Sequence, residues 1–144
     1  MYSHILVTIE HSPADATILA HVRALAKLHH AKVLLLHVAD GWAARAYDDL
    51  ALRESEEMRA DRAYLEDVAG ELAAAGIQSE WRLGRGDPAT EIVAHARKEQ
   101  VDLVAMATHG HRLINDLIRG TTVNRVRHEL DIPVLLLKAR SAAG

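Results

Sequence analysis

Two glycines followed by hydroxyl side chains give this sequence its clearest chemical signal. Nine residues separate Thr108-His109-Gly110 from Gly120-Thr121-Thr122, which precedes a helix-like stretch, Val123–Glu129. Glycine lets a ligand approach the main chain closely. A helix N-terminus offers an anion its unpaired N–H groups and the positive end of its dipole. The pattern therefore favours a phosphate site, and the alternative is an ordinary capped turn before a helix.

Basic and imidazole side chains gather around the same loop, although the formal net charge of the chain is −3. They are His109, His111, Arg112 and Arg119. Together with helix N–H groups, they would neutralise the negative charge of a di- or triphosphate that carries a bound divalent ion. The alternative is that both arginines only solvate a loop whose apolar residues pack inward, and the two interpretations are compatible.

Other chemistries find less support. Gly84–Ala89 matches a loose dinucleotide fingerprint, but it follows the third predicted strand instead of the first, so we predict a tight strand-to-helix turn there. No Gly-Lys-Ser/Thr phosphate loop occurs, and we predict no metal site from the ten histidines. His37 is expected to be a packed or hydrogen-bonded core residue. Glu10 and His109 are only candidates to activate water, which allows at most a weak ATPase.

Length and composition set broad limits. The 144 residues are most simply one domain, residues 1–144, with 49% hydrophobic and 26% charged residues. The slightly acidic balance argues against a nucleic-acid partner. No apolar stretch approaches the roughly 20 residues that span a bilayer, and no signal peptide is recognised. The absence of cysteine fits a reducing compartment. We therefore expect a cytoplasmic protein without a membrane partner.

The elements that must position these residues alternate between strand-like and helix-like patterns. The predicted strands are Ile5–Ile9, Lys32–Val38, Ile77–Leu83, Val101–Ala107 and Ile132–Leu137. Predicted helices start at Ser12-Pro13, with Ser12 as the cap, and at Asp87-Pro88, and a long one covers Asp48–Ala75 and stops at Gly76. Its Arg53–Arg62 segment is expected to be a solvated face.

This alternation predicts an α/β fold with a parallel sheet covered by helices on both faces. The third strand is more polar and is placed at an edge. Ligands of such sheets bind at the carboxyl ends of the strands, where the strand order reverses. Glu10, Val38 and Ala107–Gly110 are therefore expected to converge on one cleft.

Four landmarks in this order resemble the universal stress protein family over essentially the whole chain. Ile5–Ser12 is similar to the family's first strand and turn, which reads Val-Pro-Val-Asp-Gly-Ser, and Gly86–Ile92 resembles its Gly-x-Pro helix start. Asp102–Gly110 is similar to Asp-Leu-Ile-Val-Met-Gly-Thr-His-Gly. The fourth landmark is Gly120-Thr121 followed by Pro133–Leu136. The ATP-binding members carry Gly-x-x-Gly-x9-Gly-Ser/Thr. The spacing from Gly110 to Gly120-Thr121 is kept in full.

The resemblance implies a Rossmann-like sheet of five parallel strands in the order 3-2-1-4-5, and a stress-response regulator that binds ATP with Mg²⁺. The residues implied at the phosphates and ribose are Ala107, His109, Gly110, Gly120, Thr121 and Thr122. Those implied around the adenosine end are Thr8, Glu10, Val38 and Met106. Ala107 replaces the first glycine of the motif, and Glu10 replaces the usual aspartate. We expect Ala107 to be tolerated if its φ is negative.

The resemblance also implies a homodimer through the strand Ile132–Lys138, whose apolar edge needs cover. A further protein partner would have to sense nucleotide occupancy, and the sequence does not identify it. Two alternatives stay open beside the nucleotide-dependent regulator. One is a dimeric interaction module that binds no nucleotide, and the other is a slow ATPase.

Overall fold

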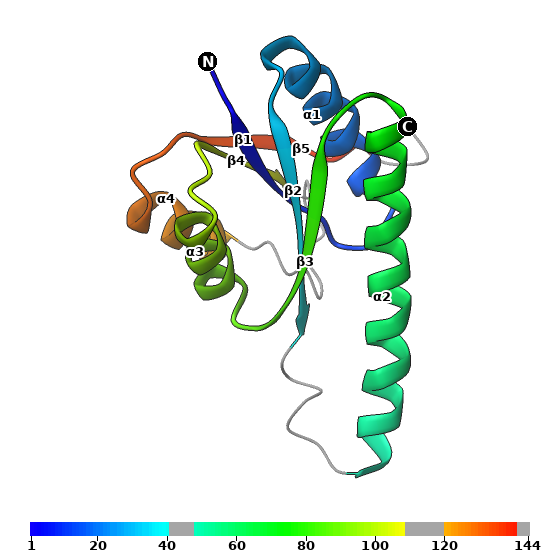
Figure 1. The fold of residues 1–144 in the computed structure, drawn as a ribbon. Helices are drawn as coiled ribbons and strands as arrows, with labels where there is room; N and C mark the ends of the chain where they lie inside the picture. Colours follow the sequence, from blue (N-terminus) through cyan, green and yellow to red (C-terminus); the bar gives the residue numbers. More distant parts are fainter. Residues whose placement is uncertain (41–47, 109–119, 141–144) are drawn as a thin grey trace.

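The computed structural model describes residues 1–40, 48–108 and 120–140, without the side chains of Asp40 and residues 48–55. Strands and helices alternate along the chain (Figure 1). The strands are β1 (His4–Thr8), β2 (Lys32–Asp40), β3 (Ser79–Gly86), β4 (Leu103–Thr108) and β5 (Val134–Lys138). The helices are α1 (Asp15–His29), α2 (Asp48–Ala74), α3 (Pro88–Lys98) and α4 (Gly120–Glu129).

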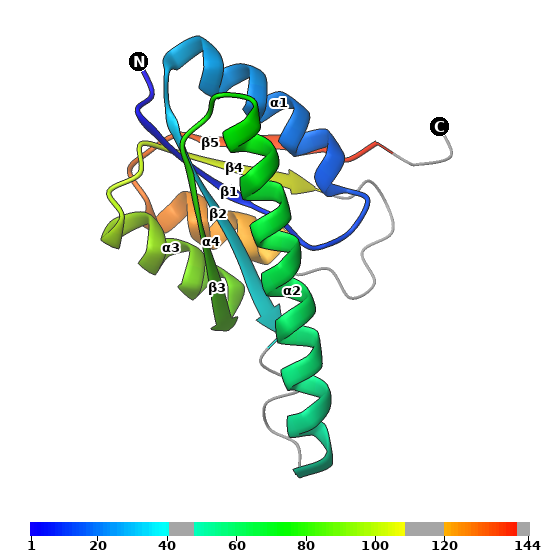
Figure 2. The same ribbon diagram turned by 45° about the vertical axis from the view of Figure 1, so that its right-hand side comes forward.

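All strand pairs are parallel, and the five strands form one sheet in the order β3-β2-β1-β4-β5. This confirms the predicted α/β fold and strand order. Helices α1 and α2 cover one face of the sheet, and α3 and α4 cover the other (Figure 2). The strand order reverses at β1, which pairs with β2 on one side and with β4 on the other.

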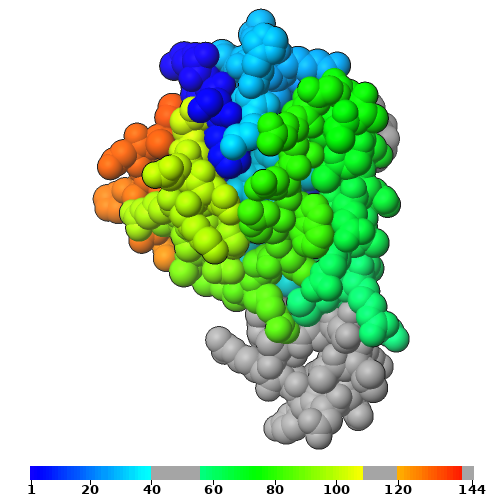
Figure 3. Space-filling view, in the orientation of Figure 1, coloured from blue at the N-terminus to red at the C-terminus, as the bar shows by residue number. Residues whose placement is uncertain are grey.

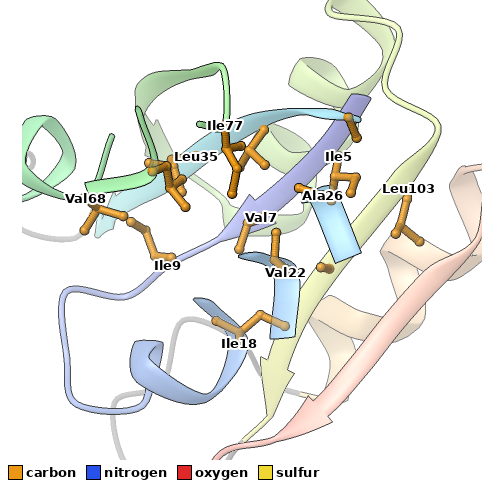
Figure 4. Packing of buried hydrophobic residues seen from close by; sticks show 14 of the residues in the cluster. Ile5, Val7, Ile9, Ile18, Val22, Ala26, Leu35, Val68, Ile77 and Leu103 are labelled. Atoms are coloured by element: carbon orange, nitrogen blue, oxygen red, sulfur yellow. The ribbon is translucent and has the colours of Figure 1, made fainter. Parts of the chain in front are cut away.

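Burial on both faces explains why the central strands read as continuous apolar runs. In β1, Ile5 and Val7 face α1 and α2, whereas Leu6 faces α3 and α4. Figure 4 shows Val22 and Ala26 of α1 pointing toward these β1 side chains. The core contains no phenylalanine, so aliphatic side chains fill it.

The two edges of the sheet differ in chemistry. On β3, the Arg82 guanidinium lies 3.1 Å from the Glu80 carboxylate and 2.9 Å from that of Glu99. In Figure 3 the side chains of β3 lie between those of α2 and α3. The β5 edge is aliphatic, and its Leu136 is 39% exposed. The polar strand is therefore an edge strand, as predicted, and β5 forms the apolar edge.

Three local boundaries differ from the prediction. Strand β3 runs to Gly86 instead of Leu83, because it keeps its register with β2. The predicted tight turn from strand to helix is confirmed, because only Asp87 separates β3 from α3. A side chain at Gly84 would meet the Glu91 carboxylate, its Cβ lying 2.8 Å from Oε1. Ser12 does not cap α1, which begins at Asp15 without a side-chain cap. Helix α4 begins at Gly120, three residues before the predicted Val123, so Gly120, Thr121 and Thr122 form its first turn.

Candidate functional site

A narrow cleft with a cavity volume of about 10 Å³ lies at the carboxyl ends of β1 and β2, on the α3–α4 side of the sheet. It is lined by Thr8, Ile9, Glu10, Leu36, Val38, Pro88 and Ile92. Three residues predicted for the site therefore meet there: Thr8 and Glu10 from the end of β1, and Val38 from β2. Met106 of β4 is fully buried in the apolar cluster that also contains Val38 and Ile92. Parallel strands explain this convergence, because their carboxyl ends share one edge of the sheet.

Helix α3 supplies a wall of the cleft that the sequence analysis missed. Pro88 is its first residue, and Ile92 lies about one turn further on. The sequence contained a signal for this wall. A helix that follows a strand of a parallel sheet begins at the carboxyl end of that strand, which is the edge where ligands bind. The wall is aliphatic, so it suits a flat apolar group.

The Thr8 hydroxyl is the most unusual atom of the cleft. Thr8 is only 5% exposed, and its Oγ1 has no hydrogen-bond partner within the described part of the chain. A buried hydroxyl without a partner costs about 1–3 kcal/mol. Natural proteins keep few such groups, and each one calls for an explanation. A polar ligand atom in the cleft would supply the missing partner.

Glu10 lies in a loop that is held by a buried carboxylate. Asp15, only 2% exposed, accepts hydrogen bonds from the main-chain N–H groups of Glu10 at 2.8 Å and His11 at 2.9 Å. The Ser12 hydroxyl lies 3.4 Å from Glu10 Oε2 and donates to it. The carboxylate of Glu10 is thus partly oriented before any ligand binds.

Ala107 does not present its methyl group to this cleft. It is buried in the opposite core cluster, with residues of α1 and α2, because side chains alternate along β4. Its φ is not positive: within the described ranges, the non-glycine residues with positive φ are His11, His30 and Gln100. The replacement of glycine at this position therefore adds no side chain to the α3–α4 face.

The first turn of α4 carries the remaining predicted residues that the structure describes. Gly120 and Thr121 are exposed, whereas Thr122 is buried. His109 and Gly110, together with His111, Arg112 and Arg119, lie outside the described residues. The structure brings together the residues implied at the adenosine end, whereas most of the implied phosphate loop lies outside the described residues.

A polar cluster fixes α4 against α3. Arg125 of α4 donates from Nη1 to Asp87 Oδ2 at 2.6 Å and from Nη2 to Thr90 Oγ1 at 3.2 Å. Asp87 caps α3 and directly precedes Pro88 of the cleft wall. Hydrogen bonds from the Thr90 hydroxyl and N–H, and then from Arg125, hold the pKa of Asp87 below its usual value. The two helices on this face thus form one connected wall.

The described ranges contain neither a cluster of metal-binding side chains nor a membrane-spanning helix. No group of three or more histidine or carboxylate side chains there is arranged to hold a metal ion. None of the helices described is long and apolar enough to cross a bilayer. His37 is buried, and its Nδ1 lies 2.9 Å from the carbonyl oxygen of Ile9, which confirms the prediction of a hydrogen-bonded core residue.

The fold and the cleft define an α/β protein with an open parallel sheet and a concave site at its strand ends. The sequence model described as the universal stress protein family matches residues 1–138. The chain belongs to this family. Universal stress protein MJ0577 of Methanocaldococcus jannaschii is 26% identical to it, over 99% of this chain and 98% of the relative.

Solved structures share the same fold. That of the hypothetical protein MJ0577 has a TM-score of 0.81 at 26% identity and covers 99% of both chains. A universal stress protein in complex with cAMP has a TM-score of 0.69 at 18% identity, covering 96% of this chain and 98% of that one. The protein from Archaeoglobus fulgidus in complex with dAMP has a TM-score of 0.66 at 19% identity, covering 95% and 98%.

Proposed function

We propose that this chain binds an adenine nucleotide, ATP with Mg²⁺, at the carboxyl ends of β1, β2 and β4, and acts as a nucleotide-dependent regulator in a stress response. The observation that carries the proposal is the buried Thr8 hydroxyl, which has no hydrogen-bond partner among the described residues, in a cleft that Glu10 also lines. Two proteins of the same fold were solved with cAMP and dAMP. A cytoplasmic location agrees with the absence of cysteine.

The two ends of a nucleotide would contact different parts of the protein. Val38 and Ile92 offer aliphatic surface to a base, and Thr8 and Glu10 offer polar partners to its edge and to the ribose. The phosphates would lie at the N-terminus of α4, where N–H groups and hydroxyls can neutralise them. Mg²⁺ would bind mainly to the phosphates, which is its usual manner in nucleotide sites.

Removing the Thr8 hydroxyl tests the adenosine end. Thr8→Val keeps the shape of the side chain, and we expect ATP affinity to fall about tenfold because one hydrogen bond to the ligand is lost. The ligand-free variant should be at least as stable as the wild type, because it removes a buried hydroxyl that has no partner in the described ranges. Isothermal titration calorimetry and thermal unfolding measure the two effects.

Thr8→Ser is the matched control, since it keeps the hydroxyl and should bind ATP nearly as the wild type does. The loss in Thr8→Val should be equal for ATP and adenosine, because the hydroxyl faces the base end. Equal affinity of Thr8→Val and the wild type would remove Thr8 from the site. A wild-type protein that binds no adenine nucleotide would overturn the proposed function itself.

We propose further that the chain forms a homodimer through β5. This strand is the apolar edge of the sheet, and an unpaired apolar edge favours association. Leu136→Lys should therefore convert a dimer into a monomer in sedimentation velocity. Leu28→Lys is the control, because Leu28 is an exposed leucine on helix α1 and not on β5. A wild-type monomer, or a monomer produced only by Leu28→Lys, would refute the β5 interface.

A further inference from the structure

The loop between β1 and α1, residues 9–14, holds Glu10 next to a strained residue. His11 has a φ of 62°, in the left-handed region. A residue with a side chain is strained there, because its Cβ lies close to the following carbonyl oxygen. Such conformations persist only where surrounding contacts hold them, and they are common beside functional sites. The contacts of this loop therefore determine where the Glu10 carboxylate lies.

The buried carboxylate of Asp15 accepts hydrogen bonds from three successive main-chain N–H groups of this loop. Asp15 Oδ1 accepts from the N–H of Glu10 at 2.8 Å. Asp15 Oδ2 accepts from the N–H groups of His11 at 2.9 Å and Ser12 at 3.3 Å. The Ser12 hydroxyl in turn donates to Glu10 Oε2 at 3.4 Å. The orientation of the Asp15 carboxylate thus fixes both the backbone of Glu10 and the residue that orients its side chain.

Tyr64 of α2 holds the Asp15 carboxylate in place. Its hydroxyl donates to Asp15 Oδ2 at 2.6 Å. Its ring stacks on the imidazole of His11, with ring centroids 4.2 Å apart and planes at 17°. Burial, and then the hydrogen bond to Asp15, raises the pKa of Tyr64 well above its usual value, so the phenol keeps the proton that it donates. Tyr64 therefore contacts both the carboxylate that holds the loop and the strained residue within it.

The position of Tyr64 is set by packing on the face of the sheet opposite to the cleft. Helices α1 and α2 lie on that face (Figure 2). Leu65 and Val68 of α2 are buried in the core cluster that also contains Val22 of α1. A helix packed into a core is a rigid support, so the side chains that it carries can hold a loop in one geometry. The α1–α2 core thus reaches the Glu10 loop through Tyr64.

We propose that Tyr64 is a positioning residue for the adenine site, which acts through Asp15 to hold the Glu10 carboxylate in the orientation that the ligand requires. This inference rests on the proposed function. Without the Tyr64 hydroxyl, the Asp15 carboxylate loses one of its fixed donors, and the strained loop can relax. The Glu10 carboxylate then occupies several orientations in the ligand-free protein. Because only one of them binds the ligand, the apparent affinity falls by the fraction that is lost.

The substitution Tyr64→Phe tests this role, because it keeps the ring that stacks on His11 and removes only the hydroxyl. We expect the affinities for ATP and for adenosine to fall by the same factor, about fivefold, since Glu10 belongs to the adenosine end. Isothermal titration calorimetry, at a temperature where the variant is fully folded, measures both. Tyr2→Phe is the matched control, because Tyr2 precedes β1 at the opposite end of that strand. It should bind ATP as the wild type does.

A double-mutant cycle separates positioning from a general loss of stability. Glu10→Ala removes the carboxylate that Tyr64 positions, and it should lower ATP affinity about tenfold. In this background Tyr64→Phe should cause no further loss of affinity, although it should still lower the free energy of unfolding in urea. In the Thr8→Val background it should again lower affinity about fivefold, because Thr8 belongs to β1 and not to the loop. A merely structural role would give the same loss of affinity in both backgrounds.

The outcomes are distinguishable. Wild-type affinity in Tyr64→Phe or in Glu10→Ala would overturn the role of Tyr64 and leave nucleotide binding intact. The same holds if the loss caused by Tyr64→Phe persists unchanged in the Glu10→Ala background, because Tyr64 would then act on another part of the site. A wild type that binds no adenine nucleotide would overturn the proposed function, and with it the role of Tyr64.

Discussion

Replacing Gly120 by valine should abolish measurable ATP binding and leave the protein folded. Gly120 is the first residue of α4, and a Cβ built there meets no atom of the described residues within 4 Å. Its φ is not in the left-handed region that favours glycine. The fold therefore does not require glycine here, and the free energy of unfolding should change by less than about 1 kcal/mol. A branched side chain would instead obstruct the close approach of a phosphate to the helix N–H groups.

We expect a loss of at least about 100-fold in ATP affinity for Gly120→Val, measured by calorimetry, which corresponds to about 2.7 kcal/mol. Gly70→Val is the matched control, because Gly70 is an exposed helical glycine with equally open surroundings. It should bind ATP normally. Unchanged affinity in Gly120→Val would show that the phosphates do not lie at the N-terminus of α4.

Replacing Asp15 by alanine should produce the largest loss of stability among the changes considered. The buried carboxylate accepts from the main-chain N–H groups of Glu10, His11 and Ser12 and from the Tyr64 hydroxyl. Alanine would leave these part-buried donors without their partner. We expect the free energy of unfolding in urea to fall by about 3–5 kcal/mol.

Two control variants give smaller expected losses in the free energy of unfolding, against which this loss can be compared. Tyr64→Phe removes one of the four donors and should cost about 1–2 kcal/mol, within the range for a hydrogen bond to a charged group. Asp67→Ala removes an exposed aspartate of α2 and should cost less than about 0.5 kcal/mol. If Asp15→Ala were no more destabilising than Tyr64→Phe, the main-chain contacts of Asp15 would contribute little.

The sequence predicted most of the fold, because local patterns control it. Apolar runs and helical periodicity gave the element types, and the resemblance to a family gave the strand order. The errors arose where distant residues decide. Ser12 is a residue type that often caps a helix. Here the loop N–H groups instead donate to Asp15, which also accepts from the hydroxyl of Tyr64, 49 residues further along the chain. Similarly, β3 extends through Gly86 because β2 continues beside it.

The candidate site could be predicted only in part. Thr8, Glu10 and Val38 line one cleft, as the rule for strand ends predicted, and strict alternation along β4 could have placed Ala107 on the other face. The segment Arg53–Arg62 was predicted to be a solvated face, and its described residues are mostly exposed. Asp61 is partly buried, because its partners come from the β1–α1 loop and from β2, which no periodicity in α2 can reveal.

The contrast between the two borders of the sheet limits how copies of this chain can assemble. The ion pairs of Arg82 with Glu80 and Glu99 place charge along the β3 border, which discourages another strand from adding there. Of the two borders that the described strands form, β5 is the one that remains open to pairing. A two-fold contact there uses the open border of both copies at once, so growth stops at a closed pair and cannot continue into a fibre.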